Sequence, residues 1–362
     1  MRLLPFPAIP TALGLISGAL LIGCDSGSMS DDDTVAGVSL TELFRTPSQS
    51  ELAQVEGDWA SRTTEPANVL VVHEASLALA GTPATLKIVS HSVGGITHYG
   101  GVLSPDGAAV GSLPVVVYSH GGDNGVSIDQ EVLLVIAFFS NIADEFVYVI
   151  PSFRSERLRY GGEEWTSDGP PSPWDYDVDD ALTLINVASE IEPAADLSRI
   201  AVVGFSRGAG VGMLMAVRDP RIDSVIEFFG PTDFFGPFVQ SVVEETLMGN
   251  PRDLPGLAYL NRTFILPLQS GSISMDTARL ELIRRSPILF AERLPDLQIH
   301  HGTADTIVPV TQAERLISVM QSLGRTAPSF ESYLYDGGQH NPLTLTGSLE
   351  RANEFLSRLL QN

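Results

Sequence analysis

Two kinds of hydrophobic pattern divide the chain near residue 113. Between residues 36 and 112, β-rich runs such as "NVLVVHEASLALAG" are separated by Gly-Gly and Pro-Asp-Gly turns, which predicts hairpins. From Leu113 onward, apolar runs of strand length alternate with amphipathic segments of helix length. This alternation is typical of a mostly parallel sheet with helices on both faces. We therefore expect an α/β architecture preceded by a short β-rich segment over residues 36–112.

Individual elements follow from the same pattern. The expected strands are "PVVVYS" at 114–119, "FVYVIPSF" at 146–153, Ile200–Val203, Val225–Phe229, Leu297–His300 and Phe330–Tyr335. The expected helices are "DYDVDDALTLINVASEI", "TQAERLISVMQS" and "SLERANEFLSRLL". The first begins with aspartates that suit a helix dipole, and the second has a predicted capping box from Thr311 to Glu314 and a stop at Gly324. Residues 232–284 interrupt the alternation and are expected to form a partial lid.

Composition narrows the possible partners. The 362 residues carry a formal net charge of −23, which argues against a nucleic acid partner. Lys87 is the one lysine, and the other basic residues are arginines. The acidic stretches "SDDDT" and "DYDVDD" lack the glycine and final glutamate of a calcium-binding loop, and no HExxH or Cys/His cluster is present. We expect neither a metal nor another cofactor.

The N-terminal residues are similar to a bacterial lipoprotein signal. Arg2 precedes an apolar stretch of signal-peptide length that ends in "LIGC" at Cys24, the single cysteine of the chain. The alternative is an ordinary signal peptide with a chance cysteine. We expect a lipoprotein signal peptide with its lipobox over residues 1–24, lipidation at Cys24 and an acidic flexible tether over residues 25–35. The protein would then be anchored to a membrane of a bacterial cell envelope, on its periplasmic or extracellular face.

One serine lies between two glycines where a strand gives way to a helix. The stretch "RIAVVGFSRGAGVGMLMAV" places Ser206 between Gly204 and Gly208. Small neighbours two positions away let strand and helix approach, and the turn exposes the hydroxyl at the positive end of the helix. A bare GxSxG is a weak signal, but this strand-to-helix context strengthens it. Ser206 is the candidate nucleophile.

A serine hydroxyl needs a base to react at neutral pH. His340, in "YLYDGGQHNP", follows a strand and lies in a glycine loop near the end of the chain, where an imidazole can reach the serine. His300 and His301 lie at a strand end and are expected to bond locally. The histidines at 73, 91 and 98 belong to the N-terminal hairpins and are expected to be surface or core residues.

The base needs a carboxylate to orient it. Asp305, in "HHGTADTIVP", follows a strand and starts a loop. Asp336 competes, but it is so close in sequence to His340 that it would need an unusual loop path. Asp296 precedes its strand and would lie at the wrong end of the sheet. The order Ser206, Asp305, His340 is therefore the predicted triad.

Backbone N–H groups next to the serine could hold a developing oxyanion. The N–H of Arg207, directly after Ser206, is one expected donor. The loop after "VVVYSH" supplies the second, with Gly121, Gly122 and Asp123 as candidates and Gly122 and Asp123 preferred. A plain glycine turn is the alternative interpretation of this loop.

Taken together, "YSHGG", "GFSRGAG", "RRSPI" with "HHGTADTIVP", and "GGQH" resemble the catalytic domain of the prolyl oligopeptidase family of serine hydrolases. The resemblance extends from about Leu113 to the end. It implies an α/β-hydrolase domain over residues 113–362 and hydrolysis of an ester or peptide bond through an acyl-enzyme on Ser206. It also implies His340 as general base and acid, Asp305 as the residue that orients it, and a small ester or peptide as substrate.

Two features differ from peptidases of that family. About eighty residues precede the hydrolase core, too few for the N-terminal β-propeller of those enzymes. Well-studied members also place a tyrosine hydroxyl in the oxyanion hole near the position of His120, and Tyr118 is not an obvious substitute. Esterases of the same fold need neither feature, so an esterase acting on small acyl esters is an alternative. A non-catalytic tethered lipoprotein is an alternative of another class.

Overall fold

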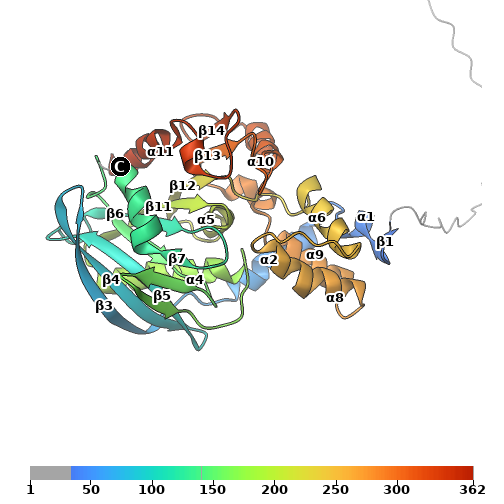
Figure 1. Ribbon diagram of the computed structural model, residues 1–362, viewed down its shortest axis with the longest axis horizontal. Coiled ribbons are helices and arrows are strands. Elements are labelled where there is room, and N and C mark those ends of the chain that lie inside the picture. Colours follow the sequence, from blue (N-terminus) through green and yellow to red (C-terminus); the bar gives the residue numbers. More distant parts are fainter. Residues whose placement is uncertain (1–33, 140, 362) are drawn as a thin grey trace, which may run out of the picture. The chain divides into compact units, whose positions relative to one another are not determined.

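Nine strands form the central sheet, in the order β14-β13-β12-β11-β6-β8-β5-β4-β3 (Figure 1). The protein's structure, a computed structural model, describes residues 34–139 and 141–361. The predicted signal segment and Cys24 lie outside the described residues. Thr34 and Val35, placed by the sequence in the tether, form strand β1 (Thr34–Val35), which pairs with β2 (Val38–Ser39). None of the helices in the described ranges combines the length and apolarity that crossing a membrane requires.

Six neighbouring strands of the sheet are parallel, and the other three join one side as antiparallel hairpins. The parallel strands are β6 (Leu113–Ser119), β8 (Val147–Pro151), β11 (Ala195–Phe205), β12 (Ile222–Phe228), β13 (Asp296–Gly302) and β14 (Phe330–Tyr335). The antiparallel strands are β3 (Ala67–Leu79), β4 (Thr82–Val93) and β5 (Ile96–Pro105). A separate three-stranded sheet contains β7 (Val126–Ser127), β9 (Arg157–Tyr160) and β10 (Glu163–Thr166).

Strands β6 and β8, in the middle of the sheet, are buried on both faces, which explains their continuous apolar runs. Along β6, Val115 and Val117 belong to one hydrophobic core, while Val116 and Tyr118 belong to a second core on the opposite face. Strand side chains alternate between faces, so a strand buried on both sides must be apolar at every position. The first core contains residues of α4 (Tyr176–Ile191), α5 (Arg207–Arg218) and α10 (Thr311–Ser322). The second contains residues of α3 (Leu133–Phe138) and α11 (Ser348–Leu356).

Residues 232–284, predicted as a lid, form a helical cap segment. It contains α6 (Pro237–Leu247), α7 (Leu257–Leu260), a π-helix at Asn261–Ile265, α8 (Leu266–Gln269) and α9 (Met275–Ile283). Figure 1 shows the cap helices in yellow and orange beside the N-terminal helices α1 (Leu40–Leu43) and α2 (Gln49–Ala60) in blue. The remaining short helices are a π-helix at Ile128–Val132 and 3₁₀ turns at Pro287–Arg293, Pro342–Thr344 and Ser357–Leu360.

Predicted and observed elements differ at two helix starts. Residues 36–112 contain α2 as well as hairpins, and its capping box lies between Ser48 and Glu51. The predicted capping box at Thr311 is wrong, because Val310 already has helical backbone angles and Thr311 lies inside α10. A side chain within the helix cannot take the N-cap position, which requires a non-helical backbone.

Two buried histidines lie opposite each other on β4 and β5. His91 pairs with His98 across the strands, and the rings stack with centroids 5.8 Å apart. Burial lowers the pKa of each ring to about 4. The His98 imidazole adds to the shift at His91, whereas at His98 Arg154 adds to it and the Asp168 carboxylate opposes it. Asp180 also faces this pair, at 3.7 Å from His98. Both rings are therefore neutral in the folded protein at pH 6.

This pair predicts a loss of stability in mild acid. In the unfolded chain each histidine is protonated near pH 6.5, whereas in the folded protein the two buried rings are protonated only near pH 4. The contribution of the two neutral rings to the free energy of unfolding is therefore fully present above pH 6.5. It is lost as pH falls toward 4, by up to about 1.4 kcal/mol per pH unit for each ring. Urea unfolding of a His91→Leu, His98→Leu double variant should show a shallower decline over this window than the parent protein. An unchanged slope would contradict the assignment.

Candidate active site

Ser206 lies on a strained turn between β11 and α5. Its backbone angles are φ 53° and ψ −119°, outside the regions that non-glycine residues commonly adopt. The Ser206 N–H donates to the carbonyl of Phe228 on the neighbouring strand at 2.8 Å, which fixes the turn from the side. Strained angles of this kind persist only where the surroundings hold them, and they concentrate at functional sites.

The glycines on either side of Ser206 are sterically required. A Cβ added at Gly208 would lie 2.0 Å from the Ser119 carbonyl oxygen and 2.5 Å from that of His120. A Cβ at Gly204 would lie 2.5 Å from the Gly208 carbonyl oxygen. The obstructing atoms belong to backbone, so they cannot rotate away. The glycine spacing in "GFSRG" therefore lets α5 approach both β11 and the loop after β6.

His340 and Asp305 come together on the loops that follow β14 and β13. The Nδ1 atom of His340 is 2.7 Å from Oδ2 of Asp305. The other oxygen of Asp305 accepts the backbone N–H groups of Ile307 at 2.8 Å and Val308 at 3.0 Å. Burial alone would raise the pKa of Asp305, but His340 and these two N–H groups outweigh burial and lower it. The carboxylate is thus kept ionised and fixed against the imidazole.

Ser206, His340, Gly122 and Arg207 line one cavity of about 290 Å³. The parallel strands β6, β11 and β13 end at the same sheet edge, so the loops that follow them converge there. His340 also packs against Phe229, with ring centroids 4.3 Å apart. The candidate nucleophile, the candidate base and one donor from each predicted oxyanion segment therefore face a shared space.

The predicted oxyanion loop packs directly against the serine turn. A Cβ added at Gly121 would lie 3.2 Å from the Cβ of Ser206, and Gly122 takes a left-handed φ of 71°. Gly122 lines the cavity together with Arg207, while Gly121 and Asp123 are not among the described residues that do so. Arg207 is the first residue of α5, and a backbone N–H at that position has no partner within the helix, which leaves it available to an oxyanion.

Comparison with known proteins identifies the architecture. Acetyl xylan esterase 1 from Thermoanaerobacterium sp. JW/SL YS485 superimposes with a TM-score of 0.60 at 16% identity, over 89% of this chain and 99% of the esterase. Acetyl xylan esterase from Paenibacillus sp. R4 gives a TM-score of 0.54 at 16% identity, over 87% and 98%. The protein has the α/β-hydrolase fold.

A third structure extends the comparison to peptidases. A puromycin-hydrolyzing peptidase of Mycobacterium tuberculosis gives a TM-score of 0.54 at 18% identity, over 76% of this chain. The chain spans about half of that peptidase, 46% of its length. No protein-family profile and no curated sequence matches the chain. The likeness to esterases and to a peptidase shows the fold, and it does not single out the prolyl oligopeptidase family.

Within this fold, the Arg207 side chain makes contacts that the sequence did not indicate. Its guanidinium is 2% exposed and donates to both oxygens of Asp177 at 2.8 Å each. It also donates to the Gly122 carbonyl at 3.0 Å and to Glu156. Burial opposes the charge of Arg207, but the two carboxylates outweigh it and raise the guanidinium pKa. Burial raises the pKa of Glu156 to about 7, with Asp177 adding to the shift and Arg207 opposing it.

The contact between Arg207 and the Gly122 carbonyl sets the orientation of the predicted oxyanion loop. The Gly122 carbonyl is held toward Arg207, and in a planar trans peptide the N–H on the other side of the bond points the opposite way. That N–H belongs to Asp123. His120 supports the same loop, with its Nδ1 at 3.0 Å from the Gly121 carbonyl and its ring stacked on Phe153 at 4.4 Å. Arg207 and His120 are therefore positioning residues for this loop.

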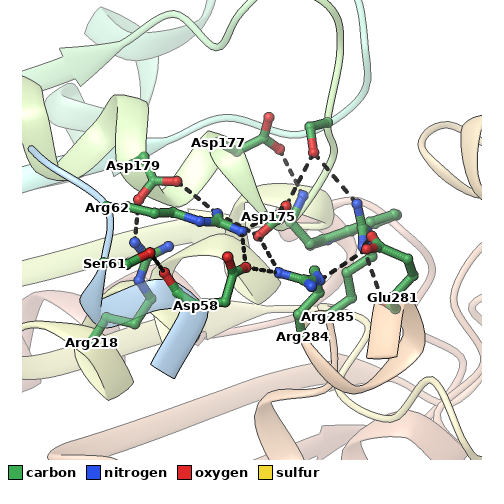
Figure 2. A network of polar contacts seen from close by, with 12 residues as sticks. Asp58, Ser61, Arg62, Asp175, Asp177, Asp179, Arg218, Glu281, Arg284 and Arg285 are labelled. Atoms are coloured by element: carbon green, nitrogen blue, oxygen red, sulfur yellow. Dashed lines mark hydrogen bonds and ion pairs between the residues drawn. The ribbon is translucent and has the colours of Figure 1, made fainter. Parts of the chain in front are cut away.

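The aspartates at the start of α4 form buried ion pairs as well as a helix start. Asp177 contacts Arg207, Asp175 and Asp179 contact Arg62, and Asp180 contacts Arg154. Figure 2 shows how Arg62, from the segment after α2, reaches between Asp175 and Asp179. The sequence signal was present as four aspartates within six positions of an amphipathic helix. From the local pattern these aspartates are explained by the helix dipole alone. Their pairing with arginines is not visible there, because the arginine partners lie far away in sequence.

The other candidate residues lie apart from the cavity lining. His300 bonds Tyr335 and Gln298, and the Nε2 atom of His301 lies 2.8 Å from the Val308 carbonyl, which confirms the local roles expected for both. The Tyr118 hydroxyl donates to Glu131 at 2.8 Å. Asp336 lies 3.5 Å from the Thr303 hydroxyl, whereas Asp305 is the carboxylate that contacts His340.

Proposed function

We propose that the protein is a serine hydrolase that cleaves carboxylic esters, with Ser206, His340 and Asp305 as its catalytic triad. The observation that carries the proposal is the 2.7 Å contact between Asp305 and His340, together with the cavity that His340 shares with Ser206. Three segments far apart in sequence thus supply a hydroxyl, an imidazole and a carboxylate to one site. A non-catalytic lipoprotein would have no need of this arrangement.

The proposed reaction proceeds through an acyl-enzyme. The Ser206 oxygen attacks the ester carbonyl carbon while Nε2 of His340 accepts the serine proton. The tetrahedral intermediate collapses when the protonated imidazole gives that proton to the departing alkoxide, which leaves as the alcohol. Water then attacks the acyl-serine while His340 accepts one of its protons, and the imidazolium returns that proton to the Ser206 oxygen as the bond to the acyl carbon breaks and the carboxylic acid leaves. Asp305 stabilises the imidazolium in both halves of the cycle.

The oxyanion of each intermediate would be held by backbone N–H groups. Arg207 supplies one from the first turn of α5, where the helix dipole adds a favourable partial charge. The loop of Gly122 and Asp123 supplies the second, in an orientation fixed by the Arg207 side chain. Such donors stabilise the transition state most when they are already in position before the reaction.

Ester substrates are favoured over peptides by the site and by the comparisons. The two acetyl xylan esterases align over nearly their whole length, whereas the alignment covers only 46% of the peptidase. The Glu164 carboxylate forms ion pairs with Arg157 and Arg159 on the small sheet at 3.2 Å each, so it is already partnered by side chains of this chain. Peptide hydrolysis of the prolyl oligopeptidase type remains the second candidate, supported by the peptidase fold match.

A fluorophosphonate probe tests the nucleophile. We expect the full-length protein to be labelled, with the adduct mapping to Ser206 by peptide mass spectrometry, and Ser206→Ala to remain unlabelled. Ser198→Ala, an exposed serine on the same strand β11, is the matched control and should label normally. The same preparation should hydrolyse p-nitrophenyl butyrate and leave a proline-containing peptide anilide intact.

Two results would count against this proposal. A folded protein that is never labelled and cleaves neither substrate would contradict the serine hydrolase. Labelling at Ser206 with faster cleavage of the anilide than of the ester would favour the peptidase.

Lipidation at Cys24 and a cell-envelope location stay predictions from the sequence, since residues 1–33 lie outside the described ranges.

A further inference from the structure

The cavity beside Ser206 has an apolar wall built from the cap and from one tryptophan. Phe238, Leu254 and Leu257 of the cap segment line it, together with Trp174 from the loop before α4. Among the described residues that line the cavity, Arg207 is the one that carries a full charge, and its guanidinium is already paired with Asp177 and Glu156. The cavity therefore offers hydrocarbon contact and no unpaired charge to a substrate.

Trp174 is held in place by glycines on two sides. A Cβ added at Gly210 on α5 would lie 2.8 Å from the indole, and one at Gly256 in the cap would lie 2.4 Å from it. Phe234 contacts the indole edge-on, with centroids 5.0 Å apart. The indole thus fits between α5 and the cap and forms a rigid wall one helical turn beyond Ser206.

The backbone around Trp174 is fixed as firmly as its ring. Its φ of 60° is unusual for a bulky residue. Its N–H donates to Asp177 at 2.9 Å, the same carboxylate that holds Arg207. Residues on both sides are also bound, because Arg285 donates to the Pro173 carbonyl at 2.9 Å and Arg62 pairs with Asp175 at 2.7 Å (Figure 2).

We infer that this cavity is an acyl site for an uncharged hydrocarbon chain of about six to eight carbons, and that Trp174 sets its length. The inference rests on the proposed serine esterase. A cavity of about 150 Å³ holds a benzene ring, so one of 290 Å³ has space for a longer chain beyond the reacting carbonyl. An acetyl group would leave most of this apolar surface without contact.

The position of the wall assigns the acyl side of the ester to this cavity. Trp174 packs over Gly210, along the helix whose first N–H groups face the oxyanion. His340 lies against Phe229, and its imidazole must reach the leaving alcohol to return the proton. An ester bound with its carbonyl oxygen at the Arg207 N–H and its alcohol beside His340 directs the acyl chain toward Trp174.

A chain-length series tests the inference. We expect kcat/KM of the full-length protein on p-nitrophenyl esters to rise by about fourfold for each methylene beyond acetate, since each buried methylene gains about 0.8 kcal/mol. The rise should peak at about six to eight carbons and then fall. A series of alkyl acetates, which varies the alcohol, should show no such peak. A preference for acetate, or a peak in the alcohol series alone, would overturn the acyl site.

Variants at the cavity wall test which side chains set the preferred acyl chain length. Leu254→Trp fills the cavity and should move the optimum to shorter chains, whereas Leu266→Trp adds the same bulk at an exposed cap position outside the lining and should leave it in place. Trp174→Ala should move the optimum to longer chains. Should Trp174→Ala fail to fold, Leu254→Ala provides the same test of enlargement.

The outcomes separate this inference from the proposed function. Rapid acetate hydrolysis, with a rate that does not change on substitution of Leu254 or Trp174, would contradict the acyl site and leave the proposed serine esterase intact. Absence of both fluorophosphonate labelling and ester hydrolysis would remove the esterase, and the acyl site with it. A chain-length optimum that moves in opposite directions in the two variants would support the acyl site.

Discussion

Replacing Asp305 with asparagine will lower kcat on the preferred ester by about 10⁴-fold, the loss typical of this change in a Ser-His-Asp triad. Oδ1 of Asp305 accepts two backbone N–H groups, so the asparagine oxygen must stay on that side. The amide NH₂ then faces Nδ1 of His340 and donates to it. The imidazole is forced to carry its proton on Nε2, and it can no longer accept the proton of Ser206.

Asp336→Asn is the matched control. That carboxylate lies four residues from His340 in sequence and 3.5 Å from the Thr303 hydroxyl, and its loss should change kcat by less than about twofold. Both variants should unfold at similar urea concentrations to the parent, which separates chemistry from stability. A loss of less than tenfold in Asp305→Asn would show that another group orients His340.

Replacing Gly208 with alanine should prevent normal folding or destabilise the protein by more than about 4 kcal/mol, among the largest effects of single substitutions. The added methyl group would occupy space 2.0 Å from the Ser119 carbonyl oxygen and 2.5 Å from that of His120. Relief would require α5 to move away from β6, which would displace Ser206 and open the core. Soluble yield and the urea midpoint measure the effect.

Gly57→Ala provides the contrast. Gly57 lies in α2, is exposed, and has open space where a Cβ would be added. Alanine there should stabilise the protein by about 0.5–1 kcal/mol, because it removes the flexibility that glycine has in the unfolded chain. Similar behaviour of the two variants would mean that the close approach of α5 to the loop after β6 is not tight.

The fold was accessible from sequence because its determinants are local. Strands β6 and β8 are buried along their whole length, so an unbroken apolar run marks each of them. The predicted strand at Phe330–Tyr335, at the edge of the sheet, matches the bounds of β14. The turn at Ser206 was equally visible in the sequence, because two glycines at fixed spacing indicate that the backbones of a strand and a helix pass close to each other. The rule that parallel strands end at one edge then directed attention to the loops of Asp305 and His340.

The remaining features depend on pairings between distant residues. Arg62 and Asp175 are separated by 113 positions, and Arg207 and Asp177 by 30. Nothing in the local pattern distinguishes an aspartate that will be buried against an arginine from one that faces solvent. The role of Trp174 was hidden for the same reason, since its wall requires α5, the cap and the loop before α4 to meet.

The almost exclusive use of arginine has a consequence in alkaline solution. A guanidinium keeps its charge above pH 12, whereas an ammonium begins to lose its proton near pH 10. The arginine ion pairs around Trp174 and the predicted oxyanion loop should therefore persist at an alkaline pH at which lysines in the same positions would lose their charge. Among side chains, amine-reactive reagents can modify only Lys87, which lies 3.0 Å from the Glu192 carboxylate and far in sequence from Ser206.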